Sequence, residues 1–498
     1  MSQDNYNELV KLSKEISTLS SIHALLDWDQ ETYMPEKGIA LRSSQKQLLS
    51  SLIHEKKKSH EFKKQLSKLI DLKTGQIIDP NLEDLQKRSL LRILHDFNIA
   101  KKQSDELVKN LSEATSTACH VWSKTKKTSD FQTFAPYLKR VFDKTKEQAE
   151  ALGYQDHPYD ALLDLYEPGM TVEVLDPLFK ELKKALIPLI QKQPPKPDTS
   201  FFYGNFDKEV QRKFCIEILE TLGFDFTRGR LDRTSHPFCM GLSSNDLRLT
   251  IHGESGNLIG NIMATLHEGG HALYEQGLLE ENFGTPLGMA ASLGIHESQS
   301  RFYETRIGLS KPFWTHTYPL LQKTYPHNLE KVSFDTFYKA LTASSPSLIR
   351  VHSDELTYSL HIILRYEIEK AYLEGEIAIK DLPNIFAEKM QESLGISPNT
   401  HAEGVMQDIH WSMGLIGYFP TYTLGNIYSA QIFNQFKLNH PDWEKRVENG
   451  HLHFIRDYLN EKIHKYGRAF LPQELIENLT KEKLNAKPYI DYLKEKFT

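Results

Sequence analysis

Along most of the chain, hydrophobic residues recur every three or four positions, which is the spacing of one face of an α-helix. Near the N-terminus, the residues with this spacing are Tyr6, Leu9, Leu12, Ile16 and Leu19. Similar patterns predict helices over residues 38–55, 81–126, 131–151, 171–192, 207–222 and 354–374. The proline-rich stretch 193–200 is typical of a linker between helices. The pattern therefore predicts an all-α, predominantly helical protein.

Start and stop signals accompany two of the predicted helices. Ser353 is a reasonable N-cap for the helix over 354–374, and Gly375 follows its last residue. Another helix has Asn257 as its predicted N-cap and Gly277 as its predicted end. Its apolar stripe consists of Ile259, Ile262, Met263, Leu266 and Leu273.

One segment departs from the helical spacing and alternates between apolar and polar residues. From Asp246 to His252, apolar residues (Leu247, Leu249, Ile251) alternate with polar residues (Asp246, Arg248, Thr250, His252). A period of two predicts a β-strand with one apolar and one polar face. The polar face is either solvated or, because the strand lies just before the motif described below, turned toward a functional cleft.

Composition and charge narrow the class of protein. The chain has 498 residues, 39% hydrophobic and 25% charged, which is ordinary for a globular protein. Its net charge is −6, so the basic surface expected of a nucleic-acid-binding protein is not indicated. Only three cysteines occur (Cys119, Cys215 and Cys239), none at the C-x-x-C spacing, so neither a disulfide framework nor a cysteine zinc site is expected.

Targeting signals and membrane spans are not expected either. No stretch approaches the ~20 apolar residues of a membrane span, and the N-terminal residues lack the pattern of a signal peptide. The sequence therefore predicts a cytoplasmic protein with no membrane partner.

Residues 267–271 read His-Glu-Gly-Gly-His. On a helix, positions i and i+4 share one face, so His267 and His271 can bind one metal ion while Glu268 reaches the attacking water. The alternative is a pair of core histidines that only form hydrogen bonds. Gly269 and Gly270 disfavour that alternative, because each costs about 1 kcal/mol mid-helix relative to alanine. Such a cost is tolerated where something approaches the backbone closely.

A third ligand is needed, because catalytic zinc takes three protein ligands and keeps one position open. Glu297 lies 26 residues beyond His271, after a loop with Gly284, Pro286 and Gly288, so a helix–loop–helix hairpin can bring its carboxylate to the metal. His296 competes, but adjacent helical residues point about 100° apart, so only one should reach. Arg301, one turn on, is predicted to hold Glu297 from behind.

This ligand set predicts peptide hydrolysis. Zinc lowers the pKa of bound water to roughly 7 and polarises the scissile carbonyl. Glu268 would take the proton from the water and pass it to the leaving amine. The developing oxyanion needs further donors.

The chain resembles the carboxypeptidase Taq-type metallocarboxypeptidases over about residues 5–498. An opening segment, Leu25-Leu26-Asp27-Trp28-Asp29-Gln30-Glu31-Thr32, and six motifs follow one another in the family's order. The motifs are His236-Pro237-Phe238; Asp246-x-Arg248-x-Thr250; His267-Glu268-Gly269-Gly270-His271; His296-Glu297-Ser298-Gln299; Ile349-Arg350-Val351-His352-Ser353-Asp354; and Gly404-x-x-Gln407-Asp408-x-His410-Trp411.

The resemblance implies one domain over residues 1–498, with two helical halves around a deep groove. The implied fold is zincin-like, similar to neurolysin-like and angiotensin-converting-enzyme-like peptidases, with a small β-sheet beside the zinc helix. The resemblance also implies broad-specificity release of single C-terminal residues, a homodimer, and zinc with cobalt as a substitute. By the same matching, His267, His271 and Glu297 are the metal ligands and Glu268 is the catalytic residue.

The remaining motifs suggest substrate contacts. The strand from Asp246 to Thr250 is expected to pair with the substrate backbone. A carboxypeptidase must bind a free α-carboxylate, which suits an arginine fork. Arg350 is the first choice and Arg248 the second, although either can equally form a structural ion pair.

Three further residues complete the candidate set. His236, held extended by the following proline, lines the groove or caps a turn. His410 and Tyr422 are candidate donors to the oxyanion, whereas Trp411 is expected to pack in the core.

Two alternatives remain open. An oligoendopeptidase with the same zinc helix would still cleave a peptide whose C-terminus is amidated. A helical scaffold with a structural zinc site would show no chelator-sensitive hydrolysis, but structural sites normally use four protein ligands and only three candidates are apparent.

Overall fold

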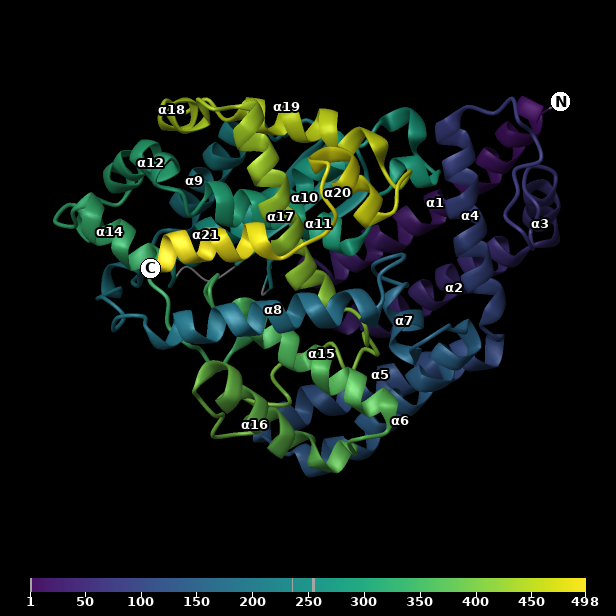
Figure 1. Ribbon diagram of the computed structural model, residues 1–498, viewed down its shortest axis with the longest axis horizontal. Coiled ribbons are helices and arrows are strands. Elements are labelled where there is room, and N and C mark those ends of the chain that lie inside the picture. The colour runs from purple at the N-terminus through teal and green to yellow at the C-terminus, as the bar shows by residue number, and fades with distance from the viewer. Residues whose placement is uncertain (1, 235, 253–255) are drawn as a thin grey trace.

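The computed structural model describes residues 2–234, 236–252 and 256–498. They form a predominantly helical protein with a small sheet (Figure 1). Before the sheet, the α-helices are Ser2–Thr32 (α1), Ile39–Lys58 (α2), His60–Ser67 (α3), Asp84–Lys102 (α4), Asp105–Thr128 (α5), Phe131–Leu152 (α6), Pro158–Leu163 (α7), Val172–Gln191 (α8) and Lys208–Leu222 (α9). After it, they are Leu258–Gly277 (α10), Leu293–Arg301 (α11), Lys311–Thr324 (α12), Pro326–Leu329 (α13), Phe334–Leu341 (α14), Tyr358–Glu374 (α15), Leu382–Leu394 (α16), Pro420–Asn439 (α17), Trp443–Glu448 (α18), His453–Lys462 (α19), Pro472–Thr480 (α20) and Lys487–Phe497 (α21).

Two helix predictions need correction. The helix predicted over 81–126 is two helices, because α4 ends at Lys102 and Ser104 caps α5 by accepting from the backbone N–H of Leu107. The helix predicted over 354–374 begins at Tyr358, and Ser353 does not cap it. The Asp354 carboxylate accepts the backbone N–H groups ahead of this helix instead. Its predicted end is correct, since Gly375 closes α15 in the left-handed conformation.

In the described residues, three strands form the sheet: Gly229–Thr234 (β1), Cys239–Ser243 (β2) and Asp246–His252 (β3). The order is β1-β3-β2, with β1 parallel and β2 antiparallel to β3. The predicted strand is therefore the central one. Its polar face is only partly open, because Thr250 is fully buried.

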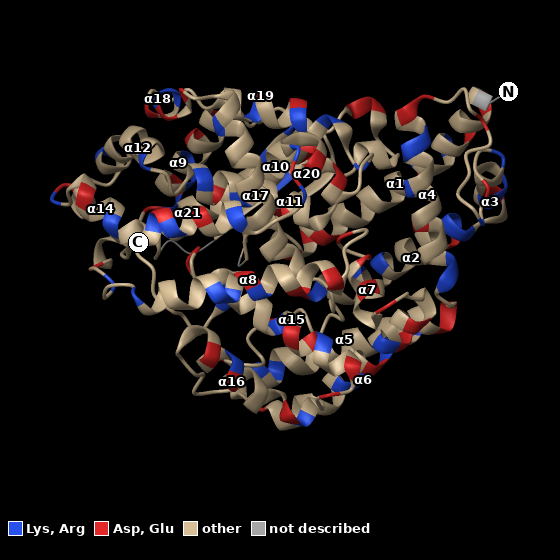
Figure 2. Cartoon of the chain, in the orientation of Figure 1, with Lys and Arg blue, Asp and Glu red and all other residues tan. Residues whose placement is uncertain are grey.

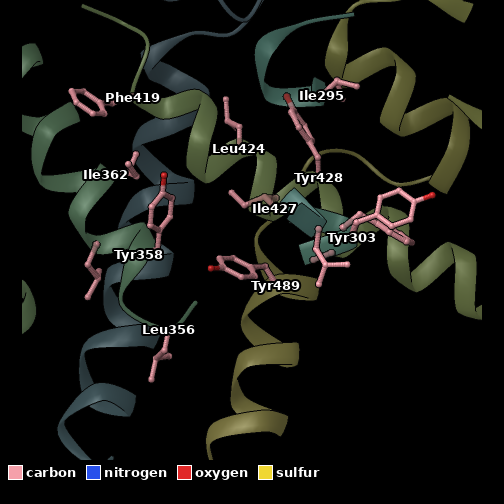
Figure 3. Packing of buried hydrophobic residues seen from close by; sticks show 14 of the residues in the cluster. Ile295, Tyr303, Leu356, Tyr358, Ile362, Phe419, Leu424, Ile427, Tyr428 and Tyr489 are labelled. Atoms are coloured by element: carbon pink, nitrogen blue, oxygen red, sulfur yellow. The ribbon is translucent and has the colours of Figure 1, made fainter. Parts of the chain in front are cut away.

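The core surrounds α17, a helix that the periodicity did not predict. Most of its positions are buried, so apolar residues occur all around it and no single face stands out. Figure 3 shows Leu424, Ile427 and Tyr428 of α17 packed among residues of other helices. A smaller, separate cluster joins α1, α3 and α4. In Figure 1, α17 descends from the group around α10 and α11 toward α15.

Charged residues of both signs are interspersed over the helices (Figure 2). Among the helices of the described residues, none is both long enough and apolar enough to span a bilayer.

Candidate active site

Helix α10 presents the two histidines of the His-Glu-Gly-Gly-His motif on one face. Asn257 caps this helix, as predicted, by accepting from the backbone N–H of Gly260, and the helix ends at Gly277. The ring centroids of His267 and His271 lie 4.9 Å apart. The helical spacing alone therefore brings both imidazoles to one point.

The two mid-helix glycines have separate packing reasons. A Cβ at Gly270 would lie 2.5 Å from the carbonyl oxygen of Gln299 and 2.7 Å from Cα of Ser300, both on α11. A Cβ at Gly269 would lie 2.6 Å from Cδ2 of Leu219. The predicted close approach is thus made by the protein's own chain, and Gly270 lets the backbone of α11 approach α10.

Helix α11 brings Glu297 to the two imidazoles. Its Oε2 lies 3.6 Å from Nε2 of His267 and 3.5 Å from Nε2 of His271. The three ligating atoms lie within 4.8 Å of one another. Zinc bonds of about 2.0–2.1 Å at tetrahedral angles would separate ligand atoms by roughly 3.3 Å. The spacing in the structure therefore fits one divalent ion. We call residues 258–301, with this site, the metal hairpin.

Hydrogen bonds at the far side of each ring fix the orientation of the histidines. Nδ1 of His267 lies 2.8 Å from Oε2 of Glu304, and Nδ1 of His271 lies 3.1 Å from the carbonyl oxygen of His296. Each Nε2 is thereby directed at Glu297. Carboxylates behind ligating histidines are typical of metal sites, where they set the tautomer. Sequence analysis did not identify Glu304, which lies on the π-helical turn Phe302–Ile307.

Arg301 forms no hydrogen bond with Glu297, although the two charges are near enough to attract each other. Its Nη1 donates to Oε2 of Glu304 at 2.6 Å and its Nε to Oδ1 of Asn426 at 2.8 Å. It therefore supports the carboxylate behind His267, and Glu297 is held by the hydroxyl of Ser300 at 3.0 Å. The competing residue, His296, pairs with Glu275 at 2.9 Å and stacks on His271 with centroids 4.4 Å apart.

Electrostatics at the three candidate ligands suits a cation. Burial opposes ionisation of Glu297, but the neighbouring histidines hold its pKa near 2. Burial lowers the pKa of His271 to about 3, so this ring is neutral. For His267, burial acts in the same direction, yet Glu297 and Glu304 raise its pKa to about 9. The acidic pair thus attracts a positive charge, which a proton or a divalent ion can supply.

Glu268, the remaining motif residue, is buried at 8% exposure. Burial raises its pKa to about 7, with His267 opposing and Glu297 adding to the shift. A carboxylate with a pKa near neutrality is suited to accepting and returning a proton.

The second group of polar residues comes from residues 404–419, which precede α17 and contain turns without a regular helix. We call them the donor segment. Nε2 of His410 lies 3.1 Å from the hydroxyl of Tyr422, at the start of α17. Nδ1 of His410 is buried and has no hydrogen-bond partner within the described residues. Burial lowers the pKa of His410 to about 4, so its ring is neutral. As expected, Trp411 packs in the core.

Arg350 is part of a buried charge cluster. Its Nε and Nη2 both donate to Oδ1 of Asp408, at 3.0 and 2.9 Å, and its Nη1 donates to the hydroxyl of Tyr358. Arg365 donates to the other oxygen of Asp408 at 2.8 Å. The ion pair foreseen as an alternative for Arg350 is therefore present, and carboxylate binding by Arg350 stays a prediction.

The motif residues of β3 are engaged within the chain. Arg248 pairs with Asp246 on the same strand and lies 4.6 Å from the ring centroid of Trp28. The hydroxyl of Thr250 accepts from the N–H of Phe238 and donates to its carbonyl. His236, by contrast, is exposed.

Strand addition to β3 is contradicted, because β1 and β2 occupy its two edges. Among the described strands, β2 lies at the edge beside α10 and faces a cavity of about 1000 Å³. Gly241, Ser243, Glu275 and His296 all line this cavity. The open edge next to the metal hairpin is therefore that of β2.

Comparison with known proteins agrees with this architecture. The model of the carboxypeptidase Taq (M32) metallopeptidase family matches residues 8–497. Carboxypeptidase 1 of Bacillus subtilis is 42% identical, over 99% of this chain and 97% of that protein. Thermostable carboxypeptidase 1 of Thermus thermophilus is 40% identical, over 99% and 98%. The crystal structure of an M32 carboxypeptidase from Deinococcus radiodurans has a TM-score of 0.95 at 33% identity, covering 99% of both chains.

Proposed function

The chain belongs to the carboxypeptidase Taq (M32) family of metallopeptidases and is a carboxypeptidase, and on that premise we propose that it releases single C-terminal residues from short peptides with broad specificity, using zinc. A helical scaffold does not agree with this membership. The observation that carries the proposal is that His267, His271 and Glu297 come together. They are two half-buried rings and a buried carboxylate, and their ligating atoms lie within 4.8 Å of one another.

The three candidate ligands leave room for chemistry at the ion. A zinc ion held by His267, His271 and Glu297 would polarise the scissile carbonyl and lower the pKa of a water molecule. Glu268 would remove a proton from the attacking water and deliver it to the leaving amine nitrogen. Its raised pKa, about 7, makes both transfers accessible near neutral pH.

The donor segment would serve the oxyanion. The neutral ring of His410 and the hydroxyl of Tyr422 are hydrogen-bonded to each other, and one or the other would turn its proton to the oxyanion as the charge develops. The substrate backbone would run along the open edge of β2, where its N–H and C=O groups find partners. This edge replaces β3 as the proposed site of strand addition.

An oligoendopeptidase is the alternative within the same class of chemistry. The two are separated by a pair of peptides identical except for a free or an amidated C-terminus, incubated with and without a chelator. We expect chelator-sensitive release of the last residue from the free peptide and at least a hundredfold slower cleavage of the amide. Equal cleavage of both peptides would favour the oligoendopeptidase.

The remaining expectations stay predictions. They are the similarity of the fold to the neurolysin-like and angiotensin-converting-enzyme-like peptidases, the division into two helical halves around a groove, the replacement of zinc by cobalt, the homodimer and the cytoplasmic location. Substrate contacts by His236, Asp246, Arg248, Thr250 and Arg350 belong with them.

A further inference from the structure

Two buried glutamates outside the candidate active site have the same unusual environment. Glu167 and Glu369 are both 0% exposed. Each accepts a tyrosine hydroxyl and a glycine N–H, and neither forms an ion pair among the described residues. Burying a carboxylate without a cation is costly, and burial raises the pKa of both to about 7. Their contacts must therefore be favourable enough to offset that cost.

Glu167 lies at the N-terminus of α11. Its Oε2 accepts from the backbone N–H of Gly294 at 2.8 Å, three residues before Glu297. A side chain at position 294 would occupy the space of this carboxylate, since a Cβ there would lie 2.5 Å from Oε2. The preceding residue contributes too, because the carbonyl of Tyr166 accepts from the N–H of Leu293 at 3.1 Å. The start of α11 is thus fixed by the segment around Glu167.

The same carboxylate holds α17. Its Oε1 accepts from the hydroxyl of Tyr428 at 2.9 Å, and Figure 3 shows Tyr428 directed toward α11 near Ile295. One turn earlier, a Cβ at Gly425 would lie 2.5 Å from Cγ of Glu297. Glu167 therefore joins the two helices between which the side chain of Glu297 is packed.

Glu369, on α15, holds the donor segment. Its Oε1 accepts from Nε1 of Trp411 at 2.7 Å, and its Oε2 accepts from the N–H of Gly417 at 3.0 Å. The hydroxyl of Tyr159 also donates to Oε2, at 2.7 Å. Trp411 directly follows His410, and this part of the chain has no helix to fix its course. The Glu369 carboxylate therefore holds the donor segment at two positions, Trp411 and Gly417.

We propose that Glu167 and Glu369 are positioning residues with separate tasks: Glu167 holds Glu297 at the metal, and Glu369 holds His410 at the oxyanion. The assignment rests on the proposed function. It predicts that each task can be disturbed alone, because the two carboxylates contact different segments.

The test uses full-length Glu167→Gln and Glu369→Gln, in which one oxygen becomes an amide that faces a donor. Zinc affinity is measured by competition with a chromophoric chelator, and kcat and KM with a peptide at saturating zinc. We expect Glu167→Gln to bind zinc 10–100-fold more weakly, which is the usual loss when a residue that orients a metal ligand is replaced. Glu369→Gln should keep zinc affinity within twofold and lose 10–100-fold in kcat with little change in KM.

Milder variants guard against misfolding. Tyr428→Phe removes one hydrogen bond from Glu167, and Tyr159→Phe removes one from Glu369. They should give the same crossed pattern, weaker zinc binding for the first and lower kcat for the second, with smaller changes. The matched control is Glu355→Gln, a buried glutamate paired with Lys496, which should change neither quantity.

The crossed pattern supports the assignment, and its absence overturns it. Equal losses of affinity and kcat in both variants, or no loss in either, would contradict separate positioning tasks. Failure of the proposed function is distinguishable, since it would appear in the unmodified protein as absent hydrolysis, while the zinc affinities of the variants can still be compared.

Discussion

The metal hairpin and the donor segment contribute to one site but are built differently. In the metal hairpin, helical spacing places His267 and His271 together, and close packing through Gly270 brings α11 alongside. In the donor segment, His410 has no regular helix around it and depends on contacts such as Trp411 with Glu369, 42 residues away in sequence. Local geometry thus fixes the metal ligands, whereas tertiary contacts fix the donors. The two regions should respond differently to mutation.

The largest effect is expected from Glu268→Gln, which removes the proton carrier while leaving the helix of the metal hairpin intact. Without a base, peptide hydrolysis should fall by about 10³-fold or more, since this carboxylate acts in both proton transfers. Zinc content, measured on the same sample, should remain one per chain. A metal-loaded variant that hydrolyses peptides at the native rate would show that Glu268 has another role.

Gly270→Ala should break the metal hairpin itself. The new Cβ meets the backbone of α11, which cannot rotate aside, so α11 must move and carry Glu297 with it. We expect about 1–3 kcal/mol of destabilisation from overpacking and at least tenfold weaker zinc binding, by urea unfolding and chelator competition.

Gly269→Ala is the matched control, because its Cβ meets only the ends of two flexible side chains, Leu219 at 2.6 Å and Leu222 at 3.8 Å, and no backbone. Zinc binding should be nearly unchanged. If both alanine variants weaken zinc binding equally, backbone contact at position 270 is not what places Glu297.

Tyr422→Phe should affect the donor side alone. Loss of one oxyanion donor typically lowers kcat by about 10²–10³-fold, and no ligand of the metal is disturbed. Steady-state kinetics at saturating zinc would measure this, with zinc affinity as the companion value. Weakened zinc binding in this variant would mean that the two regions are not independent.

The smallest effect concerns a contact outside both regions, between His95 on α4 and Asp164. The hydrogen bond that the His95 ring donates to the Asp164 carboxylate raises the pKa of His95 to about 9, above the ordinary value of 6.5. A histidine whose pKa is higher in the folded than in the unfolded state stabilises the fold at pH values below its unfolded pKa. This stabilisation is lost as the pH rises from about 6.5 to 9. His95→Gln should therefore cost about 1–2 kcal/mol at pH 6 and almost nothing at pH 10 by urea unfolding. An equal cost at both pH values would rule out this linkage.

How much the sequence predicted follows the same division. The helix of the metal hairpin, its cap at Asn257 and the meeting of its residues with Glu297 all follow from periodicity and loop length. Glu304 could not be placed, because a π-helical turn changes the phase that helical spacing assumes. Arg301 pairs with Glu304, three residues on, and not with Glu297, four residues back, a choice that the spacing of one helix face leaves open.

Long-range pairing accounts for the other differences. The alternation in β3 predicted a strand but not its central place, which depends on β1 and β2 pairing on either side. Arg350 was the first choice for the α-carboxylate, and its ion pair with Asp408 joins residues 58 positions apart, which no local pattern predicts. Glu167 and Glu369 carry no local pattern, since a buried glutamate is recognised only by the donors that surround it.

The most direct test is anomalous diffraction at the zinc edge from crystals grown with zinc. One strong peak per chain should lie about 2.0–2.2 Å from Nε2 of His267, Nε2 of His271 and a carboxylate oxygen of Glu297, with no fourth protein ligand. A peak elsewhere, a fourth protein side chain on the ion, or Glu297 directed away from it would contradict the site on which this account is built.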